Sequence, residues 1–273
     1  MTTEKNKFRK HSLAVDIGNS TLSFGLFSAG SLRRQWHIPQ EQAAGQKQLQ
    51  RLLSAHVCAI QAQVCAVTIC SVAPKAEKLV MAVCRRLFAG VPVNRFGIEI
   101  PVPLKNNYRP PESLGKDRLA NAVAAKFLYA LPAIIIDAGT ALTIDAVSAQ
   151  GEFIGGIIFP GMETCARALT ERAALLPRVA VRSVARVTGR STAQGIASGI
   201  GNGFVFLVDG LVGALLKELR LTRATVIATG GHARFLQRRS QTIQIFNNNL
   251  TLQGIEKTRL ATMKLARAKA RGI

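Results

Sequence analysis

One short residue pattern occurs twice in this sequence, at 14–27 (AVDIGNSTLSFGLF) and at 135–147 (IIDAGTALTIDAV). Each copy has an apolar run, an aspartate, a small or apolar residue, a glycine, a hydroxyl or amide residue, and a second apolar run. The chain has few aspartates, yet Asp16 and Asp137 both stand in this pattern. Because burying an unpaired carboxylate is costly, a cation or a hydrogen-bonded ligand would explain an aspartate at the end of a buried strand.

The glycine in each pattern lets the backbone approach a ligand closely, and the free N–H groups of a turn can bind phosphate. Two such turns facing each other could bind the phosphates of one nucleotide and its metal ion. The alternative is a pair of ordinary hairpins with turn-favouring residues, which for Asp16 means a turn-forming role. The repetition inside two apolar β pairs favours the phosphate site.

A third aspartate, Asp117, lies near the start of a predicted helix at 113–130, between Lys116 and Arg118. The start of a helix and a basic neighbour both favour the charged carboxylate, which can accept the proton of an alcohol. Arg118 could bind a substrate carboxylate through two parallel hydrogen bonds, which lysine cannot form. The alternatives are charge decoration of a helix start for Asp117 and a surface position for Arg118.

Other candidate motifs are weaker. The chain has no G-x-x-x-x-G-K-[ST] motif, so a P-loop kinase is excluded on motif grounds. The segment 199–204 (GIGNGF) resembles a phosphate loop but falls within a helical pattern, and close helix packing is the better interpretation. Asp145 is equally well interpreted as structural or as a group behind a metal ligand, and Asp209 as a packed or hydrogen-bonded helix residue. The five cysteines and four histidines show no zinc-ligand spacing.

The elements that must position these residues form two similar halves, each opening with a strand–turn–strand unit. The first half is predicted to contain strands at 12–18, 21–27 and 32–38, a helix at 41–54, a strand at 64–72, and helices at 74–88 and 113–130, the last with Ser113 as its cap. The second half is predicted to contain strands at 133–139, 141–147 and 153–159, helices at 161–174 and 192–218, a strand at 224–231, a further helix, and a helix near the C-terminus.

The composition fits a folded protein with a sizeable core, since 48% of the 273 residues are hydrophobic. No segment reaches the ~18 apolar residues of a membrane span, because the longest, 203–216, is too short and contains Asp209. The basic N-terminus is predicted to be a short disordered tail, without the apolar stretch of a signal peptide. Scattered cysteines, odd in number, indicate reduced thiols in a cytoplasmic protein.

The chain is strongly basic, with 36 Lys and Arg against 15 acidic residues and a net charge of +21. Such a charge attracts phosphates, nucleotides, nucleic acids or anionic membranes. The basic residues are spread along the chain, which favours a solvated basic surface over a dedicated nucleic-acid surface. With two Tyr, one Trp and no helix-turn-helix signature, we expect only nonspecific nucleic-acid binding at low salt.

The paired D-x-G-[NT] turns and the TGG at 229–231 resemble the superfamily of acetate kinase, sugar kinases, Hsp70 and actin, and within it the type III pantothenate kinases. The matching stretches occur in family order over roughly residues 13–236 and are DIGNSTLSFGLF, YRPPESLGKDRLANAVAA, IIIDAGTALTIDAVSAQGEFIGGIIFPG, LTERAALLPRV, GRSTAQGIASGI and VIATGGHARFL. Each stretch alone is a weak signal, but their combination is highly specific.

The resemblance implies an α/β protein with two ribonuclease H-like domains of the actin-like ATPase superfamily and a nucleotide cleft between them, placed here at 12–116 and 117–273. It implies transfer of the ATP γ-phosphate to pantothenate, giving 4′-phosphopantothenate, the first step of coenzyme A biosynthesis. It also implies Mg²⁺ with ATP, a monovalent cation (K⁺ or NH₄⁺) and a homodimer. The cysteines and the apolar runs described above predict a cytoplasmic location without membrane contact. The alternative is a nucleic-acid-binding or transcription accessory protein on the same fold. Retention of Asp16, Asp117, Arg118 and Asp137 favours the kinase.

The resemblance also assigns site residues by position. It implies that Asp117 is the catalytic base and that Asp137 binds the monovalent cation. The implied ATP contacts are Asp16, Ile17, Gly18, Asn19, Ser20, Thr21, Leu22, Ser23 and Thr140. The implied pantothenate contacts are Tyr108, Gly115, Lys116, Asp117, Arg118 and Thr192. Two features depart from the family: Ser20 stands where threonine is more usual, and the strong positive charge is atypical.

Overall fold

The structure is a computed structural model that describes residues 11–43, 45–173, 175–181 and 186–271. The N-terminal tail expected from the sequence falls almost wholly on residues 1–10, which lie outside the described residues. The chain divides into two compact units. The first comprises the chain up to residue 105, residues 109–127 and residues 250–273, and the second comprises residues 106–108 and 128–249.

The first unit contains a five-stranded sheet with the order β3-β2-β1-β4-β5. Its strands are β1 (His11–Ile17), β2 (Thr21–Ser28), β3 (Ser31–Pro39), β4 (Val64–Ser71) and β5 (Val93–Arg95). β1 pairs antiparallel with β2 and parallel with β4. The central strand β1 is therefore hydrogen-bonded on both edges.

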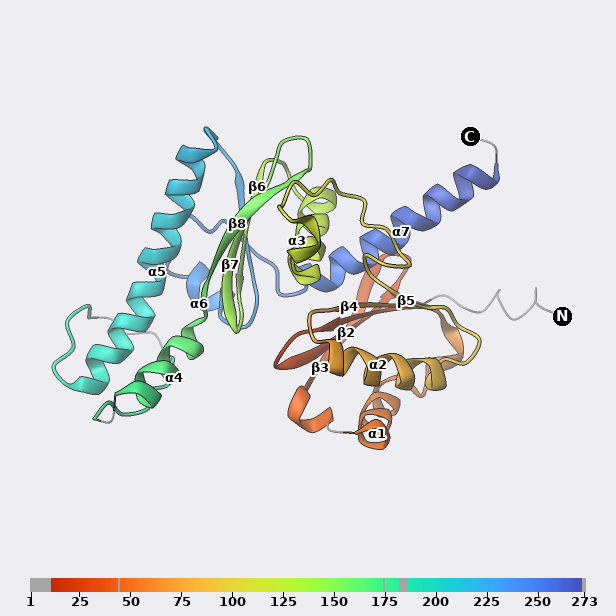
Figure 1. Cartoon of the computed structure of the whole chain (residues 1–273), viewed down its shortest axis with the longest axis horizontal. Coiled ribbons are helices and arrows are strands. Elements are labelled where there is room, and N and C mark those ends of the chain that lie inside the picture. Colours follow the sequence, from red (N-terminus) through yellow and green to blue (C-terminus); the bar gives the residue numbers. More distant parts are fainter. Residues whose placement is uncertain (1–10, 44, 174, 182–185, 272–273) are drawn as a thin grey trace. The chain divides into compact units, whose positions relative to one another are not determined.

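Helices cover both faces of this sheet (Figure 1). α1 (Gln46–Val57) and α2 (Pro74–Leu87) pack on one face, and α3 (Lys116–Leu128) and α7 (Leu250–Ala270) pack on the other. Because side chains alternate along a strand, Leu13 and Val15 of β1 join the core with α1 and α2, whereas Ala14 packs with α3 and α7. Asp16 has the same parity as Ala14 and faces the side of the sheet that α3 and α7 cover.

α7 is attached to the sheet by a buried charged group. The Ser12 hydroxyl of β1 donates a hydrogen bond of 2.9 Å to Glu256. Arg259 donates two more to the same carboxylate, at 2.7 and 2.6 Å. All three residues are buried. Because removal of one partner from a buried ion pair typically costs ~3–5 kcal/mol, this contact fixes where α7 lies on the sheet.

The second unit repeats the same sheet topology, with the order β10-β9-β6-β7-β8. Its strands are β6 (Ala133–Ala138), β7 (Ala141–Val147), β8 (Phe153–Pro160), β9 (Thr225–Thr229) and β10 (Ile245–Phe246). Read from β8, the order matches that of the first sheet read from β3, and β6 takes the place of β1. The doubled architecture expected from the sequence is confirmed.

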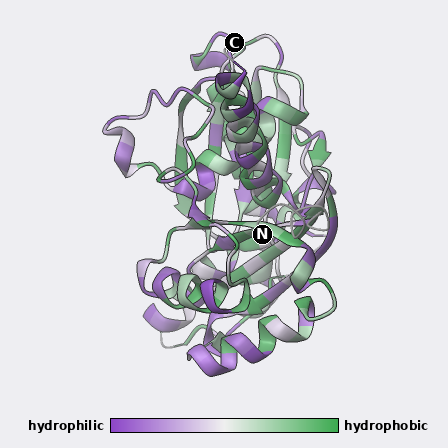
Figure 2. Cartoon of the chain, turned by 90° about the vertical axis from the view of Figure 1, so that its right-hand side faces the viewer, coloured by the Kyte–Doolittle hydropathy of each residue, from purple (hydrophilic) through white to green (hydrophobic). Residues whose placement is uncertain are grey.

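The helices of the second unit are α4 (Met162–Arg172), α5 (Thr192–Glu218) and α6 (Ala233–Gln237). They pack with the sheet in one apolar cluster, to which α5 contributes Phe204, Val208 and Val212. Figure 2 shows that the strands are mostly hydrophobic, whereas hydrophilic residues gather on the outer helices and loops. Each unit therefore has its own core.

Some predicted boundaries differ from the structure. The helix expected at 41–54 divides into a 3₁₀ turn, η1 (Gln40–Ala43), and α1. The prediction that Ser113 caps the next helix is wrong, because Ser113 ends the 3₁₀ turn η3 (Pro111–Ser113) and donates to the Pro110 carbonyl at 2.7 Å. The division placed between residues 116 and 117 does not coincide with the two units, since α3 and α7 pack on the first sheet. A third 3₁₀ turn, η2, spans Gln61–Gln63.

The expectation that no segment is long enough to span a membrane is wrong, because α5 meets the length and composition of such a span. It is the only helix in the described part of the chain that does so. Asp209 of α5 accepts hydrogen bonds from the Ser240 hydroxyl and from residues 241 and 242, as a hydrogen-bonded helix residue was expected to do. Burial favours the neutral acid, but these hydrogen bonds outweigh it and lower the pKa of Asp209. We therefore interpret α5 as a core helix of the second unit.

Candidate functional site

The β1–β2 turn carries the first aspartate–glycine pattern. Asp16 is half-buried near the end of β1, in register with Ser23 of β2 and Cys70 of β4. The turn closes through a 3.0 Å hydrogen bond from the Gly18 N–H to the Thr21 carbonyl. Hydroxyl and amide side chains are therefore presented at the end of the sheet next to a carboxylate.

Not every residue of this turn can present its side chain to a ligand. Ile17 and Leu22 are fully buried in the core, so they can reach a ligand only through their backbone atoms. Asn19 and Ser20 are exposed. The Ser23 hydroxyl lies 3.0 Å from His37 Nδ1, which ties it to β3.

Gln40 is a residue of this turn that sequence reasoning missed. Its backbone N–H donates to the Ser20 carbonyl at 2.9 Å, and its side-chain amide donates to the Gly18 carbonyl. Both bonds hold the turn from the end of β3. The sequence offers no signal for this role, because Gln40 stands among polar residues at the start of a helical pattern.

The β6–β7 turn of the second unit is built by matching hydrogen bonds. The Gly139 N–H donates to the Ala141 carbonyl at 3.0 Å, as Gly18 does to Thr21. The Gly161 N–H donates to the Thr140 carbonyl at 2.9 Å, as the Gln40 N–H does to the Ser20 carbonyl in the first turn. The two turns thus share local geometry as well as residue pattern.

Asp137 lies near the end of β6, in register with Thr143 of β7 and Thr229 of β9. The next residue after Thr229, Gly230, has φ +92°, and a Cβ there would lie 2.5 Å from Asp137 Oδ1. A Cβ on Gly161 would lie 2.2 Å from the Gly139 carbonyl oxygen. Glycines therefore shape the space around the second turn, and only glycine fits at either position.

The start of α3 places Asp117 and Arg118. Asp117 is half-buried, and its Oδ1 accepts a 2.8 Å hydrogen bond from the Arg118 N–H. A Cβ on Gly115 would lie 2.5 Å from that same oxygen, so glycine is required for this side-chain position. Arg118 is only 5% exposed, which excludes the alternative of an ordinary surface arginine.

Asp16 and Asp117 both lie near one buried thiol in the first unit. Burial raises the pKa of Cys70 well above its usual value, and the charges of Asp16 and Asp117 raise it further. Cys70 is the register neighbour of Asp16, and it packs in one apolar cluster with Ala120, about one turn after Asp117 on α3. The fold therefore brings the carboxylate of the first turn and the carboxylate at the start of α3 to the same end of the sheet.

The remaining predicted residues are divided between the units. Lys116 is half-buried beside Asp117 in the first unit, and Thr140 is exposed in the second turn. Tyr108 belongs to the second unit, where its ring packs edge-on against Phe153 with centroids 6.0 Å apart. Thr192 is exposed on the first turn of α5.

The carboxylates of the two turns suit hard cations. Asp16 and Asp137 are half-buried and flanked by hydroxyl-bearing residues, and Mg²⁺ and alkali cations take oxygen ligands. The described residues contain no group of three or more His, Cys, Asp or Glu side chains that could hold a metal ion.

Asp145, on β7, is only 1% exposed and therefore lies buried inside the second unit.

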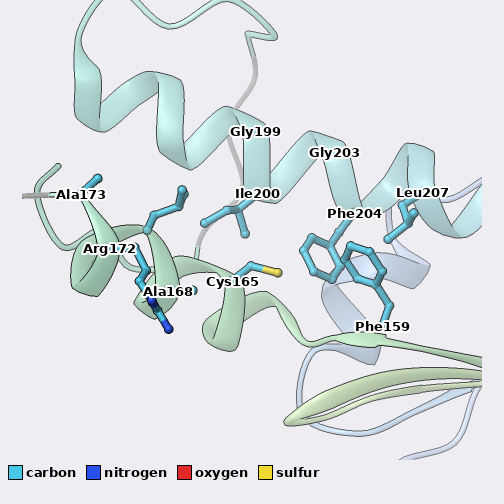
Figure 3. Close-up of a pocket in the computed structure, with 11 residues that line it drawn as sticks. Phe159, Cys165, Ala168, Arg172, Ala173, Gly199, Ile200, Gly203, Phe204 and Leu207 are labelled. Carbon is cyan, nitrogen blue, oxygen red and sulfur yellow. The ribbon is translucent and has the colours of Figure 1, made fainter.

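An apolar hollow of about 540 Å³ lies between α4 and α5 (Figure 3). Its wall includes Phe159, Cys165, Ile200 and Phe204. The segment GIGNGF is helical as expected, but a Cβ on Gly199 or Gly203 would meet nothing within 4 Å. These two glycines therefore open the helix surface toward the hollow, and among the described residues nothing makes the close packing expected at them.

Comparison with known proteins gives consistent matches over most of the chain. The family model described as type III pantothenate kinase matches residues 12–214. The type III pantothenate kinase of Persephonella marina is 34% identical over 247 residues, covering 89% of this chain and 96% of the relative. That of Desulfosudis oleivorans is 37% identical over 252 residues, with the same coverage.

Two solved structures share the fold. A candidate Baf family transcriptional activator from Campylobacter jejuni has a TM-score of 0.58 at 19% identity, covering 92% of this chain and 99% of that one. The ethanolamine utilization protein EutJ from Carboxydothermus hydrogenoformans has a TM-score of 0.54 at 13% identity, covering 91% and 89%. At these identities the likeness supports the fold alone. The predicted α/β fold with two ribonuclease H-like domains is confirmed.

The glycine beside Asp137 is tested by Gly230→Ala, with Gly231→Ala as the matched control. At residue 230 an added Cβ meets Asp137 Oδ1 at 2.5 Å and the Ala138 carbonyl carbon at 2.8 Å, on a backbone with positive φ. At residue 231 a Cβ meets nothing within 4 Å. We expect the Gly230 variant to lose ~1–3 kcal/mol of stability in urea unfolding and the Gly231 variant to stay within ~0.5 kcal/mol. Equal midpoints for the two variants would contradict the tight packing at Gly230.

Proposed function

Because the chain belongs to the type III pantothenate kinase family, we propose that its two aspartate–glycine turns bind the phosphates of ATP and that Asp117 accepts the proton of the pantothenate hydroxyl. The protein is a transferase that uses ATP and a divalent metal ion to phosphorylate pantothenate in coenzyme A biosynthesis. The observation that supports the assignment most is that Cys70, the register neighbour of Asp16, packs with Ala120 of the helix that begins with Asp117, so the two carboxylates lie at one end of the first sheet.

The proposed reaction is an in-line transfer. The primary hydroxyl oxygen of pantothenate forms a bond to the γ-phosphorus, the bond from that phosphorus to the bridging oxygen breaks, and its electron pair leaves with ADP. The hydroxyl proton passes to the Asp117 carboxylate. Asp117 suits this role because the start of α3 favours its negative charge and Gly115 lets the side chain fold back over the turn.

The proposed pantothenate contacts are Arg118, Lys116, Gly115, Tyr108 and Thr192. Arg118 is the strongest candidate to bind the substrate carboxylate, because its planar guanidinium can form two parallel hydrogen bonds and its burial limits its motion. Tyr108 can offer both an apolar ring and a hydroxyl.

The proposed ATP contacts are the turn from Asp16 to Ser23 and Thr140 of the second turn. The burial of Ile17 and Leu22 limits these two to backbone contacts, so Asn19, Ser20 and Thr21 are the side chains available. Asp16 is the residue that would hold Mg²⁺, which when bound neutralises charge on the phosphates.

Asp137 is proposed to bind a monovalent cation, K⁺ or NH₄⁺. Its carboxylate is half-buried near the end of an apolar strand, and its register neighbours Thr143 and Thr229 carry hydroxyl oxygens of the kind that such cations take as ligands. A bound cation there would place a positive charge next to the half-buried carboxylate, which favours the ionised form.

The accessory-protein alternative is not favoured by the family matches. We propose that the +21 charge gives only sequence-independent binding of nucleic acid, which weakens as salt rises. We propose a cytoplasmic location as well, since all five cysteines are free thiols.

We propose that the protein is a homodimer that uses the α4–α5 surface of the second unit. Phe206 is 64% exposed, and it follows Gly199 and Gly203 at helical spacing on α5, next to the apolar hollow. Ile158 and Phe159 of β8 are also exposed. A second copy of this chain fits such a surface because a twofold interface pairs one apolar patch with itself, and glycines allow helices to approach closely.

The kinase function is tested by a coupled ADP-release assay with ATP, with and without pantothenate. We expect pantothenate to trigger ADP release. Asp117→Asn should lower kcat by ~10²–10⁴-fold with an unchanged unfolding curve, because the amide cannot accept the proton. Glu112→Gln, an exposed acid-to-amide change just before α3, serves as the control and should keep wild-type kcat. Near-full activity of the Asp117 variant would remove its role as base.

The cation site is tested by assaying the enzyme in K⁺, NH₄⁺, Na⁺ and Tris buffers at equal ionic strength. We expect activity in K⁺ and NH₄⁺ and a sharp loss in Na⁺ or Tris alone. Asp137→Asn should blunt that dependence, because the neutral amide holds a cation weakly. Equal wild-type rates in all four media would eliminate this role for Asp137.

The dimer surface is tested by Phe206→Glu, with Leu265→Glu as the control on an exposed apolar residue of α7 in the first unit. We expect light scattering to give a dimer for the wild type and the control, and a monomer for the Phe206 variant, because a charge cannot be buried in an apolar interface without a partner. A dimeric Phe206 variant would place the interface elsewhere.

A further inference from the structure

We propose that α7 is a positioning element for the start of α3, and that Gly254 is the residue through which α7 sets the position of Asp117. This inference rests on the proposed role of Asp117 as the proton acceptor. α7 follows the region 12–214 that the family model matches, and none of the predicted site residues lies on it.

The contact between the two helices is made by backbone atoms. A Cβ on Gly254 would lie 1.8 Å from the Ala120 carbonyl oxygen and 2.6 Å from its carbonyl carbon. A backbone carbonyl in a helix cannot rotate away as a flexible side chain can, so an added methyl group must push the helices apart. Ala120 is three residues after Asp117, about one turn along α3. A shift at Ala120 is therefore transmitted to the residue that carries the carboxylate.

Two further contacts hold the first turns of α3 against α7. The Thr251 hydroxyl lies 2.8 Å from Oδ1 of Asn121, whose side chain is completely buried. Ala120 also packs in one apolar cluster with Leu252 and Ile255 of α7. The same cluster includes Cys70, the register neighbour of Asp16 on β4.

α7 is in turn fixed to the strand that carries Asp16. Ser12 of β1 donates to Glu256, and Arg259 completes that buried charge pair. On β2, a Cβ at Gly25 would lie 3.2 Å from Leu252, so the strand surface is shaped to receive α7. One helix thus contacts both the strand of Asp16 and the helix of Asp117, and it sets the spacing between the two carboxylates.

This spacing matters because proton transfer requires the acceptor within hydrogen-bond reach of the hydroxyl. A displacement of about 1 Å far from the chemistry can cost up to ~10²-fold in rate. ATP binding by the β1–β2 turn does not depend on α3 in the same way. Disturbing the α7–α3 contact should therefore lower kcat far more than it raises the KM for ATP.

The experiment compares Gly254→Ala with Gly213→Ala, a matched change inside α5 where a Cβ meets nothing within 4 Å. Both substitutions add the same helix propensity. We expect the Gly254 variant to be folded by circular dichroism at the assay temperature, with kcat lowered at least ~10-fold and the KM for ATP within ~2-fold. The Gly213 variant should keep wild-type values of both.

A second measurement is independent of activity. Hydrogen exchange of the peptide covering residues 114–127, without substrates, should be faster in the Gly254 variant and unchanged in the Gly213 variant. If Gly254→Ala does not fold, Thr251→Val removes the hydroxyl contact with Asn121 at nearly constant volume. That variant should show the same faster exchange and a ~3–10-fold lower kcat, because loosened packing leaves Asp117 less well placed.

Three outcomes are decisive. A folded Gly254 variant with wild-type kcat and unchanged exchange overturns the inference. A loss of folded protein with unchanged kcat per folded molecule, in either variant, shows a structural role only and also overturns it. If the wild type releases no ADP in response to pantothenate, the proposed function fails instead. Faster exchange in α3 would then still support the packing role of Gly254, and unchanged exchange would overturn that as well.

Discussion

The structure depends on the central strand of each sheet being hydrogen-bonded on both edges. β1 and β6 each pair antiparallel with the following strand and parallel with a strand from later in the chain. The turn that closes the antiparallel pair and the end of the parallel strand therefore meet at one edge of the sheet. Asp16 and Asp137 lie near the ends of β1 and β6, so this strand pairing places both carboxylates at that edge.

Backbone proximity, more than side-chain chemistry, then shapes the proposed site. Gly115, Gly161 and Gly230 each lie where a Cβ would collide with a carboxylate or a carbonyl. Gly230 brings a loop from a distant part of the chain against Asp137, Gly161 brings the start of α4 against the second turn, and Gly115 leaves space for the Asp117 carboxylate. The proposed reactive groups are a few aspartate carboxylates, which many proteins contain. The distinctive feature of this site is how closely the surrounding backbone approaches them.

Much of this could be predicted from the sequence, because local patterns determine it. The strands around Asp16 and Asp137, the Thr192–Glu218 helix and the doubled topology follow from periodicity and repetition. Gln40, Glu256 and Gly254 could not be predicted. Their roles come from contacts with residues remote in the chain, such as the bond from Ser12 to Glu256. Ser113 failed as a predicted cap because the chain forms a 3₁₀ turn before α3 begins at Lys116.

The discontinuity of the first unit has a consequence for biosynthesis. Its sheet and α3 are made early, but the helix that covers their shared face, Leu250–Ala270, is translated only after the whole second unit. On the ribosome, residues 128–249 can fold while the first sheet still has an uncovered apolar face and Ser12 still lacks Glu256. A nascent chain that stops before this helix cannot complete the first unit. Completion of the first unit therefore waits for the translation of residues 250–270, and until then its apolar face is exposed to the contacts that lead to aggregation.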